Sequence, residues 1–148
     1  SAAVLPELMA VKEIDQVQLS KALTTNVLAT QALIARFDPL LKASTDPRLV
    51  YLTTSVATAP RAYWGAYAAS KAAAEVLIDC HAQESRNISK LRVAIIDPGA
   101  TRTAMRAKAY PGEDPASVKT PDVVATRVVA LLGEQFASPH RERVNQSS

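Results

Sequence analysis

Three consecutive segments decide the fold, and they read LVYLTTS at residues 49–55, GAYAASKAAAEVLIDCHAQES at 65–85 and LRVAIID at 91–97. The first and third are short and apolar on both alternating faces, which is typical of strands that are covered on both sides. The middle segment combines high helix propensity with an absence of proline, so it predicts a helix. The order strand, helix, strand predicts a βαβ unit with buried parallel strands, and therefore an α/β fold.

Apolar periodicity predicts another helix before this unit. Over residues 18–37 the apolar side chains recur at spacings near three and four, and Asn26 lies within the apolar stripe. Because proline lacks the backbone donor that a helix interior uses, we expect Pro39 to kink or end this helix.

After the unit, the chain alternates between loop and helix. Residues 98–119 hold several prolines and glycines and predict a long loop with one short helix around 103–108. Pro121 stands where helices commonly begin, so residues 121–132 predict a further helix. The polar segment beyond Pro139 indicates at most a short strand-like tail.

The composition is that of one globular domain, and we expect residues 1–148 to form a single one. Hydrophobic residues make up 48% of the sequence and charged residues 21%, so the chain should bury a core. The formal charge of +3 comes from scattered basic residues, and only 5% of the residues are aromatic. We therefore expect no nucleic-acid binding.

The cysteine and histidine counts and the lengths of the apolar runs exclude several kinds of structure. Cys80 is the only cysteine and cannot form an internal disulfide, so a cytoplasmic setting is expected. With only His81 and His140 beside it, cysteine and histidine alone cannot supply the four ligands of a zinc cluster. No stretch approaches the roughly 18 apolar residues that cross a bilayer, so we expect no membrane partner.

Tyr67 and Lys71 lie four residues apart in the middle segment, so their side chains rise from one face of the predicted helix. A free tyrosine has a pKa of about 10, and a nearby ammonium lowers that value towards the neutral range. The pair is therefore a candidate general acid and base. Such a spacing also arises by chance, so the pair indicates a catalytic site only if other functional residues lie near it in the fold.

The ends of the two predicted strands point to the same place. Ser55 closes the first strand, and Pro98-Gly99 follows the second. In open parallel sheets, ligands bind at the carboxyl ends of the strands. A serine or a Pro-Gly step is by itself commonest as a turn residue, but beside the Tyr-Lys pair they predict a shared site.

This set of residues resembles the short-chain dehydrogenase/reductase family, in which a Ser, a Tyr-x-x-x-Lys and an Asn on the preceding helix form the catalytic group. The resemblance implies a partial Rossmann-like fold, a doubly wound parallel sheet that corresponds to the family's carboxyl-terminal half. The matching segments are Thr25-Asn26-Val27, Gly65 to Lys71 and Pro98-Gly99-Ala100-Thr101-Arg102-Thr103, and the implied catalytic residues are Asn26, Ser55, Tyr67 and Lys71.

The same resemblance implies reversible hydride transfer between NAD or NADP and a small-molecule carbonyl or secondary alcohol. Tyr67 would exchange a proton with the substrate oxygen, Ser55 would hydrogen-bond that oxygen, and Lys71 would bind the nicotinamide ribose and lower the pKa of Tyr67. Asn26 would organise a water-linked proton path, and family helix contacts imply a homo-oligomer. The residues implied to bind the cofactor are Tyr67, Lys71, Pro98, Gly99, Thr101 and Thr103.

The sequence departs from the family pattern at its beginning. Members of the family begin with a strand and a Gly-rich turn that binds the pyrophosphate, whereas Gly65, Gly99, Gly112 and Gly133 are too widely spaced to form one. We expect a carboxyl-terminal half that is inactive and binds cofactor poorly by itself. The sequence leaves open whether the other half is absent from the protein or precedes these residues in a longer polypeptide.

Two other functions stay open at this point. A non-catalytic assembly or interaction module would keep the half-sheet for packing only, and a nucleotide-sugar epimerase or dehydratase also uses Tyr-x-x-x-Lys. The Pro-Gly-x-x-x-Thr loop argues against the second. We interpret Arg102 and Arg106 as solvated loop charges, and Trp64 either as a packing residue or as part of a substrate cleft.

Overall fold

Parallel strands form the centre of the structure, a computed structural model that describes residues 3–145. Within these residues, β1 (Arg48–Leu52), β2 (Arg92–Asp97) and β3 (His140–Arg143) form one sheet in the order β1-β2-β3. β2 is therefore the central strand. Its register places Val93 opposite Leu49 of β1 and Ala94 opposite His140 of β3.

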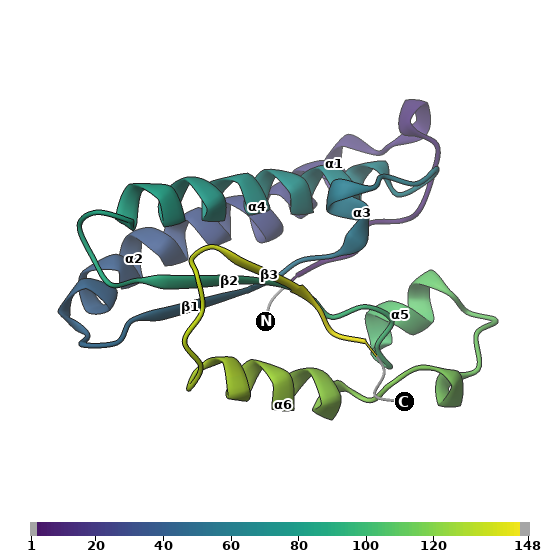
Figure 1. Cartoon of the computed structure of the whole chain (residues 1–148). Helices are drawn as coiled ribbons and strands as arrows, with labels where there is room; N and C mark the ends of the chain where they lie inside the picture. The colour runs from purple at the N-terminus through teal and green to yellow at the C-terminus, as the bar shows by residue number, and fades with distance from the viewer. Residues whose placement is uncertain (1–2, 146–148) are drawn as a thin grey trace.

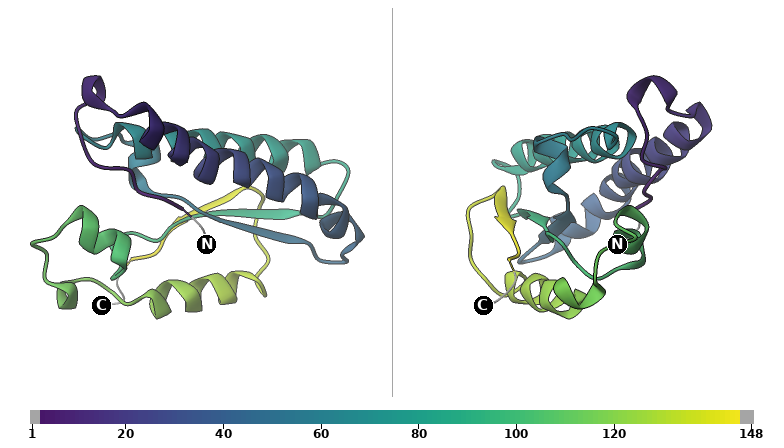
Figure 2. Two further views of the ribbon diagram at one scale, coloured as in Figure 1. Left: turned by 180° about the vertical axis from the view of Figure 1, so that it is seen from behind. Right: turned by 90° about the vertical axis from the view of Figure 1, so that its right-hand side faces the viewer.

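Helices cover both faces of the sheet, which confirms the expected α/β fold with a doubly wound parallel sheet (Figures 1 and 2). On one face lie α1 (Gln16–Leu23), the π-helical turn η2 (Thr24–Leu28), α2 (Ala29–Ala43) and α4 (Gly65–Ser85), and on the other lies α6 (Pro121–Leu131). The shorter elements are η1 (Val11–Glu13), α3 (Ser55–Thr58), α5 (Ala104–Ala109) and η3 (Pro115–Ser117).

The alternate residues of β2 build the two halves of the core. Val93 and Ile95 pack on the side of α4, whereas Ala94 and Ile96 pack on the side of α6. Successive side chains of a strand point to opposite faces, so a central strand that is covered on both sides is apolar at every position. This explains why residues 91–97 show no polar alternation.

β1 differs from the expected buried strand. In the described chain it pairs only with β2, and its residues are half-buried because it lies at an edge of the sheet. The strand also ends at Leu52, three residues before the predicted end. The backbone N–H of Thr53 still donates to Ile96, at 2.8 Å, and the chain then turns so that Ser55 becomes the first residue of α3.

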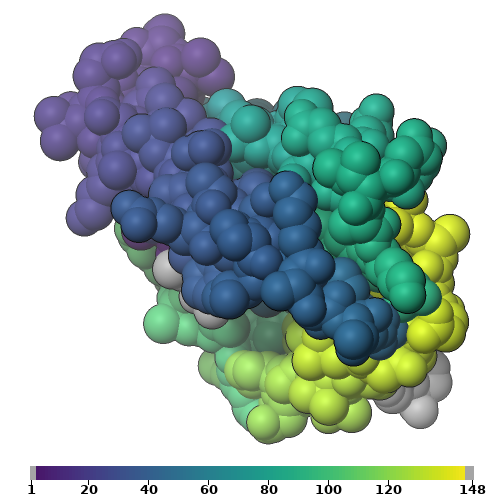
Figure 3. Space-filling model, turned by 90° about the vertical axis from the view of Figure 1, so that its left-hand side faces the viewer, coloured from purple at the N-terminus to yellow at the C-terminus, as the bar shows by residue number. Residues whose placement is uncertain are grey.

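Of the two outcomes expected at Pro39, a kink or an end of the first long helix, the end does not occur. α2 continues to Ala43 and ends where the N–H of Ser44 donates to Leu40 and Leu41. A proline removes the hydrogen bond to the residue four positions earlier, and that residue, Ala35, is exposed to water. The space-filling view shows α2 (blue) lying against α4 (teal) (Figure 3).

The remaining elements follow the prediction closely. α4 covers the predicted residues 65–85, α6 ends one residue before the predicted 132, and α5 is shifted by one residue from the predicted 103–108. The polar tail forms β3, a real strand of the sheet. Among residues 3–145, no helix is long and apolar enough to cross a membrane.

Candidate active site

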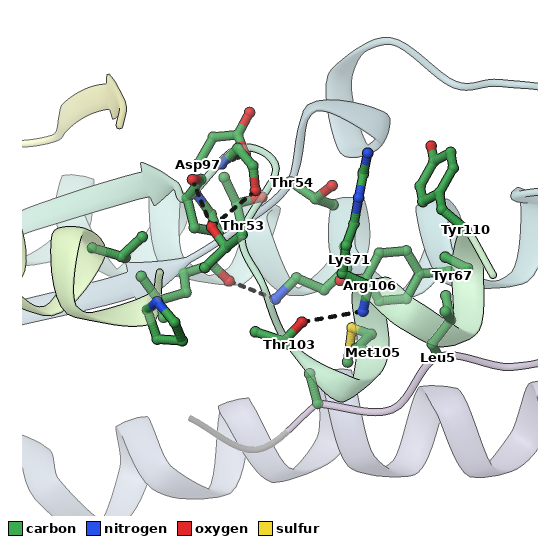
Figure 4. A pocket seen from close by; sticks show the side chains of 18 of the residues that line it. Leu5, Thr53, Thr54, Tyr67, Lys71, Asp97, Thr103, Met105, Arg106 and Tyr110 are labelled. Atoms are coloured by element: carbon green, nitrogen blue, oxygen red, sulfur yellow. Dashed lines mark hydrogen bonds between the residues drawn. The ribbon is translucent and has the colours of Figure 1, made fainter. Parts of the chain in front are cut away.

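A cavity of about 690 Å³ lies at the carboxyl edge of β1 and β2, between the start of α4 and the segment that leads into α5 (Figure 4). Its volume is that of a small-molecule site. Ser55 and Asn26 do not line it. The predicted site residues that do line it are Tyr67, Lys71, Pro98, Gly99, Thr101 and Thr103.

Tyr67 lies in the first turn of α4 and is only 8% exposed. Its ring contacts Trp64 edge-to-face, with 6.0 Å between the ring centres, and belongs to an apolar cluster with Leu5 and Val56. Burial raises the pKa of Tyr67 above its usual value, and the carboxylate of Asp97 raises it further. At neutral pH the phenol therefore carries its proton.

Lys71 lies one turn further along α4 and is 5% exposed. Its ammonium donates a hydrogen bond of 2.6 Å to the backbone carbonyl of Leu52 and lies 4.3 Å from the centre of the Tyr51 ring. Burial lowers the pKa of Lys71 to about 8, and the nearby carboxylate of Glu75 acts in the opposite direction.

The predicted lowering of the Tyr67 pKa by Lys71 is wrong for this structure. The two side chains do rise from one face of α4 into the same cavity (Figure 4). However, the ammonium of Lys71 bonds to Leu52, and the pKa of the buried phenol is raised by desolvation and by Asp97. Desolvation decides the direction because it disfavours the phenolate.

Thr53 and Thr54, and not Ser55, line the cavity at the end of β1. The hydroxyl of Thr53 bonds to the carboxylate of Glu75, which leaves the hydroxyl of Thr54 as the candidate. Thr54 is extended, with φ −158° and ψ 149°, and precedes the first residue of α3. Ser55 begins that helix, where its carbonyl accepts a bond from the N–H of Ala59. Along extended backbone, successive side chains point to opposite sides, so a shift of one residue changes which hydroxyl reaches the cavity.

Asn26 lies in the π-helical turn and is 3% exposed. Its side-chain oxygen accepts from the N–H of Val4 at 2.9 Å, and its side-chain nitrogen donates to the Val4 carbonyl at 3.0 Å and to Ser70 Oγ at 2.9 Å. Asn26 therefore joins the N-terminal segment to α4. π-Helical turns are frequent at functional sites, and the proposed proton path through Asn26 stays a prediction.

The loop after β2 turns sharply at Gly99. Gly99 has a φ of 62°, a conformation that side chains disfavour, and a Cβ there would meet Lys119 Nζ at 3.1 Å. Its N–H donates to the carboxylate of Asp97 at 2.9 Å. The hydroxyl of Thr101 bonds to Pro98 and Gly99 within the loop, and that of Thr103 accepts from the first turn of α5.

Sequence reasoning missed part of the wall, which is formed by Met105, Arg106 and Tyr110. Trp64, whose role the sequence left open, both packs against Tyr67 and lines the cavity. The reading of Arg106 as a solvated charge is wrong, because it is half-buried, binds Glu113 through two nitrogens and lies over the Tyr110 ring. The four-residue spacing of Arg106 in α5 and Tyr110 at its C-terminal end is the signal in the sequence.

The described residues offer no metal centre. Within residues 3–145, no three histidine, cysteine, aspartate or glutamate side chains come together closely enough to hold a metal ion. The polar groups that line the cavity include the Tyr67 phenol, the Lys71 ammonium and the Thr54 hydroxyl.

The sequence matches the short chain dehydrogenase family over residues 1–114. It is 46% identical to the uncharacterized oxidoreductase YciK of Escherichia coli over 109 residues, which are 74% of this chain and 42% of that protein. The similarity thus includes the segments of Asn26, Tyr67 and Pro98.

Solved structures are similar to almost the whole chain. A short chain dehydrogenase from Escherichia coli in complex with NADPH has a TM-score of 0.91 and 36% identity, over 99% of this chain and 61% of that one. A short chain dehydrogenase from Shigella flexneri in complex with NADP has a TM-score of 0.90 and 36% identity, over 97% of this chain and 60% of that one. This chain spans less than two thirds of the length of these relatives.

Proposed function

The chain belongs to the short-chain dehydrogenase/reductase family, and from this premise we propose that the protein that carries it is an NAD- or NADP-dependent oxidoreductase. It interconverts a carbonyl compound and a secondary alcohol. The single observation that carries the proposal is the shared cavity, in which the phenol of Tyr67 and the ammonium of Lys71 lie at the carboxyl edge of parallel strands. Ligands of open parallel sheets bind at this edge.

The donors in the cavity fit the nicotinamide end of the cofactor. The ammonium of Lys71 and the hydroxyl of Tyr67 suit the oxygens of a ribose, and Pro98, Gly99, Thr101 and Thr103 form an adjoining wall that suits the nicotinamide ring and its carboxamide. When bound, the cofactor supplies or accepts the hydride at the carbonyl carbon.

The proton step belongs to Tyr67. During reduction its hydroxyl gives a proton to the oxygen that becomes the alcohol, and during oxidation the phenolate takes that proton back. With its raised pKa the phenol is protonated at neutral pH, which is the form that donates a proton in the direction of reduction.

Thr54 is proposed to orient the substrate oxygen. The predicted residue for this role is Ser55, but the side chain that lines the cavity is that of Thr54. A threonine hydroxyl has the same donor and acceptor capacity as a serine hydroxyl. Asn26 donates a hydrogen bond to the hydroxyl of Ser70, which in turn donates to the backbone carbonyl of Tyr67. Asn26 thereby helps to position Tyr67.

We further propose one domain over residues 1–148, a cytoplasmic location and a homo-oligomer. Leu33, Phe37 and Leu40 of α2 are each more than half exposed, and contact with a second copy would remove them from water. Light scattering of the wild-type chain and of Phe37→Glu tests the oligomer. A lower mass for the variant supports it, and a monomeric wild-type chain contradicts it.

The 148 residues alone are proposed to bind the cofactor weakly. Gly99 lines the cavity, but the widely spaced glycines of this chain supply no Gly-rich turn for a pyrophosphate. Titration of the purified chain with NADH and NADPH tests this proposal. Micromolar binding would contradict it.

Absorbance of the reduced nicotinamide tests the oxidoreductase function itself. The longest polypeptide that carries this chain is incubated with NADPH or NADH and a panel of ketones. Consumption of the reduced cofactor, with one alcohol formed for each molecule consumed, supports the proposal. Binding of the cofactor without turnover of any ketone or alcohol favours the non-catalytic alternative.

A further inference from the structure

Aromatic rings form the wall of the cavity next to the proposed proton donor. Trp64 lies edge-to-face with Tyr67, at 6.0 Å between ring centres. Its ring centre also lies 5.9 Å from that of Tyr110, with 36° between the ring planes. Trp64 comes just before α4 and Tyr110 just after α5, so two segments distant in sequence build one aromatic surface. Met105 and Leu5 extend this surface with apolar contacts.

This surface adjoins the point where the substrate oxygen would receive its proton. The ring of Tyr67 belongs to it, whereas its hydroxyl is the proposed donor (Figure 4). A carbonyl bound at that hydroxyl therefore directs one of its substituents towards Trp64 and Tyr110. Aromatic faces and edges contact a flat ring over more area than a flexible chain, and they cost the ring less conformational entropy.

The positive charge in this wall is already neutralised. Arg106 donates from Nε and Nη2 to the two carboxylate oxygens of Glu113, at 2.6 and 2.5 Å, and its guanidinium carbon lies 3.7 Å from the centre of the Tyr110 ring. These hydrogen bonds raise the pKa of Arg106 and lower that of Glu113, so both groups stay charged and paired. A planar two-bond pair of this kind holds its geometry firmly.

The other charged groups that line the cavity also have partners. Lys71 donates to the carbonyl of Leu52. Asp97 accepts from the N–H of Gly99 and lies 3.7 Å from Arg143. A charged substrate substituent would have to displace one of these partners to find its own, and a desolvated charge without a partner is costly.

We propose that the cavity takes an uncharged ketone, or the corresponding alcohol, whose carbonyl bears a flat apolar ring that packs against the surface formed by Trp64 and Tyr110. This inference rests on the proposed oxidoreductase function for the placement of the carbonyl. The alternative of an anionic substrate requires Arg106 to leave Glu113, and it is an outcome of the test.

Three probes with the same number of carbon atoms separate these cases. Acetophenone is the neutral ring ketone, phenylglyoxylate is its anionic counterpart, and methyl hexyl ketone is the flexible neutral one. Dissociation constants for the chain are measured by ligand-observed NMR without cofactor. We expect acetophenone to bind roughly tenfold more tightly than either of the others, which is the size of one aromatic contact.

Two variants test whether the aromatic surface causes the preference for acetophenone. Trp64→Leu should weaken acetophenone binding by roughly tenfold, whereas Tyr63→Leu, at the exposed neighbouring position outside the lining, should leave it unchanged. Circular dichroism of both variants checks that the fold is retained. If Trp64→Leu loses the fold, Tyr110→Leu provides the same test on the neighbouring ring of that surface.

Several results would overturn the inference. Tighter binding of phenylglyoxylate that Arg106→Gln abolishes would show that the arginine accepts an anion. Equal binding of acetophenone and methyl hexyl ketone, or no effect of Trp64→Leu, would show that the aromatic surface does not select a ring. Ring binding without hydride transfer would contradict only the proposed function, and turnover that prefers the anion would contradict only this inference.

Discussion

The ammonium of Lys71 donates a hydrogen bond of 2.6 Å to the carbonyl oxygen of Leu52, the last residue of β1. This bond ties α4 to the strand end at which the cavity lies. It also holds a charged group that is only 5% exposed. Burial of that charge lowers the pKa of Lys71 to about 8, so the bond has consequences for stability and for pH dependence.

Lys71→Met should change how stability depends on pH. Between pH of about 8 and the ordinary pKa of 10.5, the native lysine binds fewer protons than the unfolded one. The free energy of unfolding therefore rises with pH across this window because of Lys71, and below it the buried charge is a cost. We expect Lys71→Met to lose this rise and to be more stable at pH 7 by up to about 3 kcal/mol.

Urea unfolding from pH 7 to pH 10 measures the difference between the variant and the wild-type chain. Lys21→Met, at an exposed position, serves as the control and should follow the wild-type curve. A Lys71→Met curve parallel to that of the wild type over the whole window would contradict the assigned pKa.

The two adjacent hydroxyls at the end of β1 should differ in their effect on turnover. Thr54→Ala removes the hydroxyl that lines the cavity, and we expect kcat to fall by about 100-fold, as for loss of one donor to a reacting oxygen. Ser55→Ala should leave kcat within about twofold of wild type, and Thr54→Ser should retain most of the activity. The reverse ranking of Thr54→Ala and Ser55→Ala in steady-state kinetics would assign the role to Ser55.

Asn26→Ala should destabilise the fold. It removes three hydrogen bonds, leaves both polar backbone groups of Val4 without this partner and breaks the bond between η2 and Ser70 of α4. We expect the free energy of unfolding to fall by about 2 kcal/mol. Asn87→Ala, at an exposed position, is the control.

The same variant tests whether Asn26 also serves the proton path. A structural role predicts lower stability with an unchanged pH profile of kcat, because the pKa of Tyr67 is set by its own surroundings. A changed pH profile of kcat, measured where Asn26→Ala is fully folded, would support the proton path. Unchanged stability would contradict the structural role.

The carboxylate of Glu75 should raise the pKa of Lys71. This carboxylate is buried, accepts from the hydroxyl of Thr53 and from the guanidinium of Arg141, and raises the pKa of Lys71 against the effect of burial. We therefore expect Glu75→Gln to move the pKa of Lys71 further below about 8. NMR titration of the Lys71 side chain measures this shift, with Glu84→Gln as an exposed control. An unchanged or higher pKa would be inconsistent with the assigned coupling.

The fold could be predicted from local patterns where those patterns are strong. Residues 65–85 have high helix propensity without interruption, and α4 has these bounds. β2 was predicted from its unbroken apolar run because it is covered on both faces. Pro39 does not end α2, because a helix that exposes the affected carbonyl to water tolerates the loss of one backbone hydrogen bond.

The sequence predicts that Tyr67 and Lys71 share one site, but it does not predict which hydroxyl lies beside them or the direction of the Tyr67 pKa shift. The spacing of Tyr67 and Lys71 placed both side chains in one cavity. The choice between Thr54 and Ser55 depends on where β1 ends, and a difference of one residue reverses the side that a side chain faces. The sign of the Tyr67 pKa shift depends on burial, which no spacing in the sequence reveals.

The most direct test of the central claim compares Tyr67→Phe with Tyr63→Phe in the longest polypeptide that carries this chain. Both changes remove one phenolic oxygen, but Tyr67 lines the cavity and Tyr63 is exposed outside it. With NADPH and a ketone substrate, we predict that Tyr67→Phe lowers kcat by about 1,000-fold while cofactor binding and the fold are retained. Turnover by Tyr67→Phe at the rate of Tyr63→Phe would contradict the account.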